Sequence, residues 1–212
     1  MSIVYVYVLD TLADWEIGHL TAELHSRRFF KKDAAEITLK YVGCTKDPIT
    51  TMGGVKLVPD CEISEIVMDP TSVLLLPGAD TWNAPCHDSV LEIARKLLAL
   101  GGTVGAICGA TAALARTGIL DNRNHTSNGA GFLDMFVPEY KGKDFYVDCL
   151  AYADDNLITA GSAGGLLWAK HILERLQVFA LNTLEAWYEF FRTGEAKYFF
   201  AMMQAVGESQ AQ

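Results

Sequence analysis

Short runs of hydrophobic residues recur along the chain, and longer segments between them repeat apolar positions every three or four residues. A short uninterrupted run is typical of a strand buried on both faces, and the longer period is typical of an amphipathic helix. The runs predict strands at Ile3–Leu9, Ile37–Val42, Ser72–Leu76, Thr103–Ile107, Phe145–Ala153 and Asn156–Ala160.

The helical period falls between these strands and after the last of them. It predicts helices over Ala13–Phe30, Asp88–Leu100, Gly109–Arg116, Leu166–Leu176 and Ala180–Arg192. Strands that alternate with helices indicate an α/β fold with a mostly parallel sheet. We expect a single domain over residues 1–206, followed by a polar tail, 207–212, that frays.

Three predicted loops follow the carboxyl ends of strands and carry residues of chemical interest. Asp10 follows the first strand, Gly78 follows the strand ending at Leu76, and Cys108 follows the strand ending at Ile107. In open parallel sheets the ligand crevice lies at this edge. We therefore expect these loops to meet at one site.

The composition excludes several classes of protein. The 212 residues carry a formal net charge of -9, which disfavours binding to nucleic acid or to an anionic membrane. No apolar run reaches the ~20 residues of a membrane helix, and no secretory signal precedes the first strand, so we predict a cytoplasmic protein. The five cysteines show no CxxC or CxxH spacing. We expect free thiols, no structural zinc site and no cofactor.

Cys108 stands where a strand turns directly into a helix. Ala106, Gly109 and Ala110 around it are small, as a strained nucleophile elbow requires. The following helix would aim its N-terminal amides and positive dipole end at the sulfur, which favours the thiolate. The alternative is a small buried structural cysteine. If the elbow is functional, Gly109 N–H and an amide of Gly78 or Ala79 can form an oxyanion hole.

The chain resembles the ThiJ/PfpI family, the branch of the class I glutamine-amidotransferase-like superfamily with a cysteine elbow. The resemblance covers about residues 2–190 and rests on Asp10–Glu16, Leu74–Ala79, Ala106–Thr111, Leu120–Asn128 and Leu157–Gly161. It implies a flavodoxin-like three-layer α/β sandwich and, very often, a homodimer.

The resemblance also assigns a role to Glu16 in the first turn of the first predicted helix. The family glutamate at this position hydrogen-bonds the nucleophilic cysteine. A protonated carboxyl can donate to a thiolate or sulfinate, or transfer a proton during addition to a carbonyl. Two adjacent anions repel, so one partner should be protonated. Without the resemblance, Glu16 would simply interact favourably with the helix dipole.

A catalytic histidine is missing from the positions where many family members place it. The first position, directly after the cysteine, holds Gly109, and the second, after Thr126 and Ser127, holds Asn128. His125 could reach the site if its loop bends, or it could be an ordinary loop residue. We name Cys108, Glu16 and His125 as candidate catalytic residues, and Gly78, Ala79, Gly109 and Asn128 as candidate oxyanion or substrate-binding residues.

Three functions are compatible with this sequence. The first is a cysteine-dependent enzyme acting on a small carbonyl, acyl or amide substrate; the resemblance implies glyoxalase-like, deglycase-like, protease or amidohydrolase chemistry, whereas the missing histidine argues against glutaminase action. The second is a redox-sensing stress protein in which Cys108 oxidises to sulfinate without turnover. The third is a chaperone-like module that uses the aromatic C-terminal segment.

Overall fold

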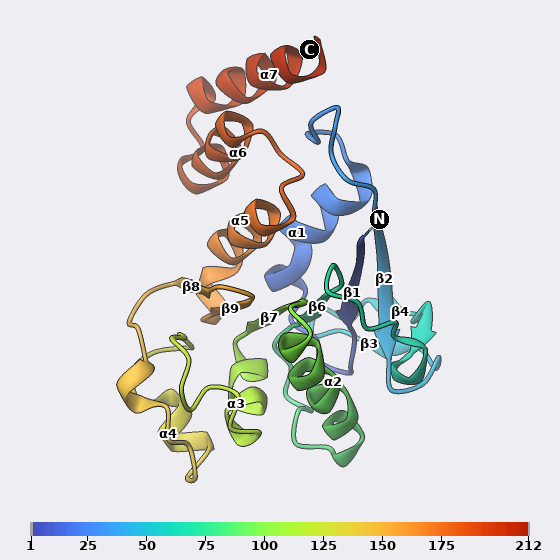
Figure 1. Cartoon of the computed structure of the whole chain (residues 1–212), viewed down its shortest axis with the longest axis vertical. Coiled ribbons are helices and arrows are strands. Elements are labelled where there is room, and N and C mark those ends of the chain that lie inside the picture. The colour runs from blue at the N-terminus through green and yellow to red at the C-terminus, as the bar shows by residue number, and fades with distance from the viewer. Residues whose placement is uncertain (1, 212) are drawn as a thin grey trace.

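A seven-stranded sheet forms the middle layer of the structure, a computed structural model that describes residues 2–211 (Figure 1). All neighbouring strands are parallel except the last pair, which is antiparallel. The strands across the sheet are β5 (Cys61–Glu62), β2 (Ile37–Gly43), β1 (Ser2–Tyr7), β6 (Val73–Leu76), β7 (Thr103–Ile107), β9 (Leu157–Ala160) and β8 (Ala151–Asp154).

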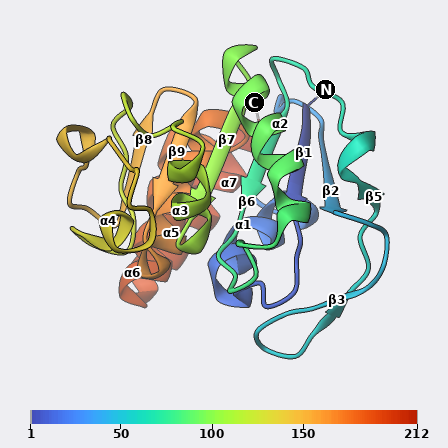
Figure 2. The ribbon, with the colours of Figure 1, turned by 90° about the horizontal axis from the view of Figure 1, so that it is seen from below.

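Helices cover both faces of this sheet, as the flavodoxin-like α/β sandwich requires. One face is covered by α1 (Asp14–Ser26) and α5 (Gly165–Leu176), and the other by α2 (Asp88–Ala99) and α3 (Gly109–Arg116) (Figures 1 and 2). The predicted fold class is confirmed. Shorter elements are β3 (Ile49–Thr50) and β4 (Lys56–Leu57), which form an antiparallel hairpin around Gly53 and Gly54, α4 (Phe132–Phe136), and the 3-10 turns η1 (Ile63–Glu65), η2 (Pro85–His87), η3 (Lys143–Phe145) and η4 (Ser162–Gly164).

The central strands are buried on both faces because helices lie above and below them. Every residue of β6 and β7 is buried. The fully buried Trp168 of α5 packs over β7 at Gly105, where a Cβ would lie 2.9 Å from its Cζ2 atom. A glycine at the centre of β7 thus allows the helical layer to approach the sheet.

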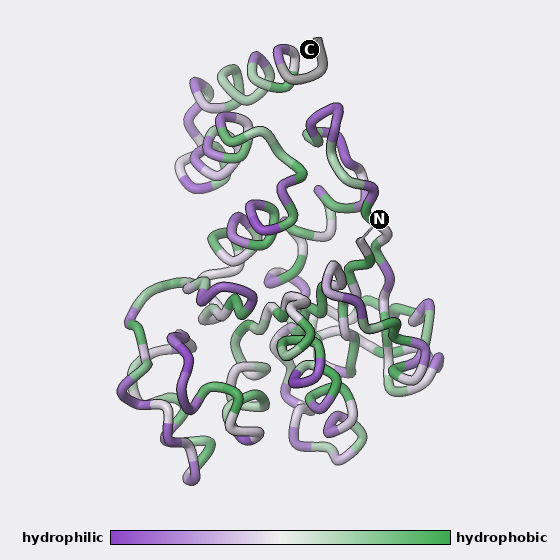
Figure 3. Tube along the Cα trace, in the orientation of Figure 1, coloured by the Kyte–Doolittle hydropathy of each residue, from purple (hydrophilic) through white to green (hydrophobic). Residues whose placement is uncertain are grey.

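The C-terminal part contains a helix that the sequence analysis missed. The predicted last helix is present as α6 (Leu181–Thr193), but after Gly194, in the left-handed region at φ 72°, the chain forms α7 (Ala196–Ala211). The backbone of residues 207–211, which we expected to be a fraying tail, continues this helix, and Gln212 lies outside the described residues. Hydrophobic and hydrophilic residues alternate around the turns of both helices (Figure 3).

Two predicted elements are shorter than expected. α1 ends at Ser26 rather than Phe30, because Arg27 adopts φ 56° and its N–H closes the last turn on Glu23 O. The strand predicted over Phe145–Ala153 forms only from Ala151, since residues 145–147 hydrogen-bond to the backbone of His125 instead. Among residues 2–211, none of the helices combines the length and the apolar character needed to span a bilayer.

Gly105→Ala is expected to destabilise the fold by about 1–3 kcal/mol, because the added methyl group collides with Trp168 and Leu75 in a packed core. Gly18→Ala is the matched control: it lies on the exposed side of α1 with open space around its Cβ, so it should stabilise the helix by about 0.5–1 kcal/mol. Urea unfolding of the two variants measures both effects. Equal shifts in the unfolding midpoint would contradict the packing described here.

Candidate active site

Cys108 occupies a strained position between β7 and α3. Its backbone has φ 58° and ψ −124°, an unfavourable region for a residue with a side chain, at a cost of about 1–3 kcal/mol. Hydrogen bonds hold it there: its N–H donates to Ala160 O over 2.9 Å, and its carbonyl accepts from the Thr111 N–H and hydroxyl. The half-buried sulfur is thereby presented at the carboxyl edge of the sheet, as the elbow pattern predicts.

Glu16 approaches the same sulfur from the first turn of α1. Its carboxyl group is completely buried; Oε2 accepts the Gly78 N–H over 2.7 Å and Oε1 accepts the Ser162 hydroxyl over 2.9 Å. A Cβ on Gly78 would lie 2.6 Å from Glu16 Oε2 and 2.8 Å from Cys108 Cβ. Only glycine fits between the carboxyl group and the cysteine, so Gly78 determines how closely they approach.

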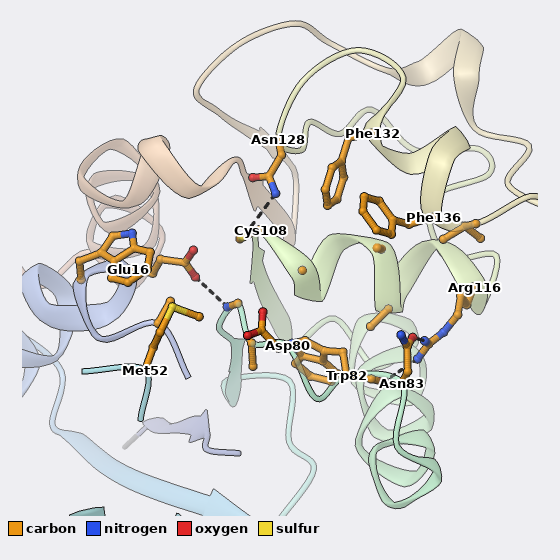
Figure 4. Close-up of a pocket in the computed structure, with 18 residues that line it drawn as sticks. Glu16, Met52, Asp80, Trp82, Asn83, Cys108, Arg116, Asn128, Phe132 and Phe136 are labelled. Atoms are coloured by element: carbon orange, nitrogen blue, oxygen red, sulfur yellow. Dashed lines mark hydrogen bonds between the residues drawn. The ribbon is translucent and has the colours of Figure 1, made fainter. Parts of the chain in front are cut away.

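Asn128 completes the surroundings of the thiol from the opposite side (Figure 4). Its Nδ2 donates to Cys108 Sγ over 3.3 Å, and its Oδ1 accepts the Ser162 N–H over 2.8 Å. Ser162 therefore joins the two residues that flank the sulfur. The sequence analysis missed Ser162, although it follows β9, another strand that ends at this edge.

The protonation of Cys108 and Glu16 is controlled by burial and by their proximity. Burial raises the pKa of the Glu16 carboxyl, against the opposing hydrogen bonds from Gly78, Ser162 and Cys108. Burial also raises the pKa of the Cys108 thiol; the Asn128 and Gly109 hydrogen bonds oppose this, while the negative charge of Glu16 and its hydrogen bond add to it. Since one charge opposes formation of the other, the pair retains a shared proton near neutral pH.

This result corrects the expectation that the helix dipole alone holds the sulfur ionised. Desolvation and the adjacent carboxylate outweigh the N-terminal amides of α3, a helix of eight residues. Glu16 is the carboxyl group beside the thiol, so it is the group that can accept the thiol proton.

His125 does not reach the thiol, so its candidate catalytic role has no geometric support. It is fully buried, with Nδ1 2.6 Å from Arg123 O and Nε2 2.5 Å from the Tyr140 hydroxyl. Its backbone pairs with Tyr146, and its ring packs edge-on against both tyrosines. These contacts turn the imidazole into the packing beneath the loop, and among the described residues no histidine lines the pocket at Cys108.

The candidate oxyanion donors differ in how free they are. The Gly78 N–H is engaged by Glu16, whereas the Gly109 N–H faces the sulfur and Ala79 lies in the pocket wall. The Ala13 N–H, just before α1, donates to Gly78 O over 2.9 Å and holds the Gly78 loop against the start of α1. Ala79, Gly109 and Asn128 are therefore the donors best placed to meet a substrate oxygen.

Cys108 opens into a pocket of about 370 Å³. Figure 4 shows Glu16 at one end and Arg116 at the other, where Arg116 is bound to Asn83 and to Trp82 O. The walls between them are mainly apolar or aromatic and are formed by Ala13, Trp15, Met52, Trp82, Ala112, Ala113, Phe132, Phe136 and Val137. The site is concave, with Glu16 and Asn128 beside the thiol and Asn83 and Arg116 at the far end.

A mostly parallel α/β sandwich with a cysteine at the elbow after a central strand, and a buried glutamate against that cysteine, defines the cysteine-elbow class of α/β proteins. Within this class, the chain belongs to the DJ-1/PfpI family, whose family model matches residues 2–175.

Two similar proteins match nearly the whole chain, and a third matches part of it. It is 42% identical over 203 residues to the uncharacterized protease YoaZ of Bacillus subtilis (strain 168), covering 96% of this chain and 97% of that protein. The crystal structure of a thiJ/pfpI family protein from Bacillus anthracis is 42% identical with a TM-score of 0.94, covering 97% of each chain. The glutathione-independent glyoxalase DJR-1.2 of Caenorhabditis elegans is 25% identical over 84 residues, 39% of this chain and 45% of that protein.

Glu16→Gln is expected to shift alkylation of Cys108 by iodoacetamide to lower pH. The wild-type thiol should react with a midpoint above the ordinary value of about 8.5, because burial and the Glu16 carboxylate raise its pKa. Glutamine removes the negative charge and lowers the midpoint. Mass spectrometry of the Cys108 peptide across a pH series measures the shift, and Cys149 in the same samples is the internal control. Identical Cys108 profiles in both proteins would disprove the coupling.

Proposed function

We propose that this protein is an enzyme in which Cys108 adds to the electrophilic carbon of a small carbonyl, acyl or amide compound. The observation that carries the proposal is the convergence of Glu16 and Asn128 on one half-buried sulfur at a concave pocket. The names of the similar proteins, an uncharacterized protease and a glyoxalase, support chemistry at such a carbon.

Glu16 supplies the proton transfer that a histidine would otherwise perform. As the sulfur attacks, the thiol proton passes to the Glu16 carboxylate, and the S–C bond forms while the carbonyl π electrons move to oxygen. Glu16 then returns the proton to that oxygen, so an aldehyde becomes a hemithioacetal with no change in oxidation state. Asn128 Nδ2 and the amides of Ala79 and Gly109 are the donors available to the developing oxyanion.

The pocket supports a small substrate. A volume of about 370 Å³ lies at the lower end of ligand pockets and suits a short-chain carbonyl compound better than a folded protein. The apolar walls favour a hydrocarbon substituent, and the polar groups at Cys108 orient the reacting carbon. We also propose that the protein forms a homodimer, and the mass of the protein in solution tests this.

A second function, redox sensing, is favoured by the hydrogen-bond donors around the sulfur. Peroxide oxidises a thiol to sulfenic acid and then to sulfinic acid, and each step reduces one peroxide to water. The Asn128 amide and the Gly109 N–H would donate to the sulfinate oxygens, and protonated Glu16 would donate a third hydrogen bond. These donors would stabilise the sulfinic product at Cys108 more than at a cysteine without such donors.

Cys108→Ser is expected to reduce turnover of the best substrate in a panel containing methylglyoxal, other short aldehydes and small esters by roughly 10³-fold or more, because it removes the nucleophile. Purified protein and kcat/KM measurements test this. Cys149→Ser is the matched control and should keep its activity, since Cys149 lies outside the pocket and bonds to Ala151 O. No wild-type turnover on the panel would contradict the enzymatic proposal.

Mild hydrogen peroxide is expected to add two oxygen atoms to Cys108 before it modifies the other cysteines. Glu16→Gln should decrease the yield of this product, because its amide donates a weaker hydrogen bond to the sulfinate than the carboxyl O–H does, even though the same substitution lowers the thiol pKa. Peptide mass mapping after graded peroxide exposure measures the site and the extent of oxidation. Uniform oxidation of all five thiols would eliminate the redox alternative and leave the enzymatic one unaffected.

A further inference from the structure

A second cluster of reactive side chains lies next to the candidate active site, on the other side of Trp82. It contains Tyr7 at the end of β1, Cys44 just after β2, and Cys86 and His87 in η2. The Trp82 ring, which lines the Cys108 pocket, packs against the Tyr7 and His87 rings with centroid separations of 5.5 Å. The function proposed for Cys108 uses none of these four residues.

The cluster is held together by short contacts between the polar atoms. The Tyr7 hydroxyl lies 2.8 Å from Cys44 Sγ and 2.6 Å from His87 Nδ1. His87 Nδ1 lies 3.5 Å from Cys44 Sγ and 3.7 Å from Cys86 Sγ. Cys86 Sγ also lies 3.8 Å from His87 Nε2, so this sulfur is beside both ring nitrogens. One ligand atom from each of Cys44, Cys86 and His87 lies within 4.8 Å of the other two.

The distances from the two sulfurs to His87 Nδ1 match the sulfur-to-nitrogen distance around a tetrahedral zinc ion. With Zn–S bonds of about 2.3 Å and a Zn–N bond of about 2.05 Å, the sulfur and nitrogen ligands of a tetrahedral site lie about 3.6 Å apart. Both sulfur-to-Nδ1 distances are within about 0.1 Å of this value. Two thiolates and an imidazole also form a ligand set that selects thiophilic ions such as Zn²⁺ over hard ions such as Mg²⁺.

We propose that Cys44, Cys86 and His87 bind a Zn²⁺ ion through two thiolates and one imidazole nitrogen, with the fourth coordination position facing solvent. The ligands come from the loops after β2 and β6, which lie on either side of β1. A bound ion would therefore tie these loops together at the carboxyl edge of the sheet.

An ion has access to this cluster from solvent. The ligands face a second pocket of about 370 Å³, and Cys86 is exposed. Asp10 and Asp47 also line this pocket, and their carboxylates accept hydrogen bonds from the Thr50 N–H and the Thr45 hydroxyl. The two carboxylates that line this pocket attract a cation toward the cluster.

Tyr7 is the positioning residue of the cluster. Its side chain is buried in the core, and its hydroxyl lies between Cys44 Sγ and His87 Nδ1. An ion can bind Nδ1 only when the Tyr7 hydroxyl releases its 2.6 Å contact with this nitrogen, and the hydroxyl can then donate to the Cys44 thiolate. Hydrogen bonds of this kind orient metal ligands, and their loss typically reduces metal affinity about 10–100-fold.

The test uses the full chain in a Cys108→Ser background, fully reduced with a phosphine, so that the active-site thiol cannot bind the metal. Zn²⁺ is titrated against a chromogenic chelator, and Co²⁺ is added separately to detect thiolate-to-metal charge transfer. We expect one ion per chain, a charge-transfer band, and proton release on binding. Because the readouts do not depend on turnover, this proposal and the proposed enzymatic function can fail separately.

Substitutions identify the ligands. Cys44→Ser and Cys86→Ser should each abolish the charge-transfer band or weaken Zn²⁺ binding more than Tyr7→Phe, which should weaken it about 10–100-fold. Cys149→Ser is the matched control and should bind like the parent. Circular dichroism checks the fold, and Cys86→Ser changes an exposed side chain. Absence of binding in the reduced parent, or binding unchanged by both Cys44→Ser and Cys86→Ser, would overturn the proposal.

Discussion

The buried contact between Glu16 and Cys108 is the constraint on which the rest of the site depends. A carboxyl group with no exposed surface requires hydrogen-bond donors, and it has them in the Gly78 N–H and the Ser162 hydroxyl. Each donor belongs to a loop that leaves a different strand at the same sheet edge. The contact therefore joins α1, the loop after β6, the elbow after β7 and the loop after β9.

Burial also controls the protonation of this cysteine. A helix N-terminus favours a thiolate, but here desolvation and the neighbouring carboxylate raise the thiol pKa. The result is a thiol with a base beside it rather than a permanently ionised sulfur. Such a pair can deliver a thiolate at the moment of attack while the resting thiol is less exposed to side reactions. The absence of histidine from the described pocket is compatible with catalysis on this basis.

The segment from Pro77 to His87 connects the two sites of the molecule. Gly78 and Ala79 face Cys108, Trp82 lines that pocket, and Cys86 and His87 end the segment at the second cluster. The Trp82 indole N–H donates to Pro77 O, and its ring packs on His87, so the segment folds on itself as a compact loop. An ion bound at Cys86 and His87 would therefore be separated from the Cys108 pocket by the Trp82 ring.

The sequence by itself determined the fold class, the strands β1, β2, β6, β7 and β9, and the position of the cysteine elbow, but it missed β5. Hydrophobic periodicity is a local property, and strand ends such as Leu76 and Ile107 mark the functional edge of a parallel sheet directly. The resemblance added Glu16. Local patterns failed where residues 145–147 bond to the distant His125 rather than continue β8. They also missed α7, which begins shortly after the glycine that ends α6.

Only the tertiary structure decided which side chains meet. It turned His125 into the packing beneath its loop and brought Ser162 to Glu16 across 146 positions of sequence. It also placed Cys44 beside His87, although no short-range metal motif links residues 43 positions apart. The physical reason is that hydrogen bonds, desolvation and ligand geometry depend on distances in space. The side chains concerned come from loops after different strands, and the distances between them are set only when the helices pack on the sheet.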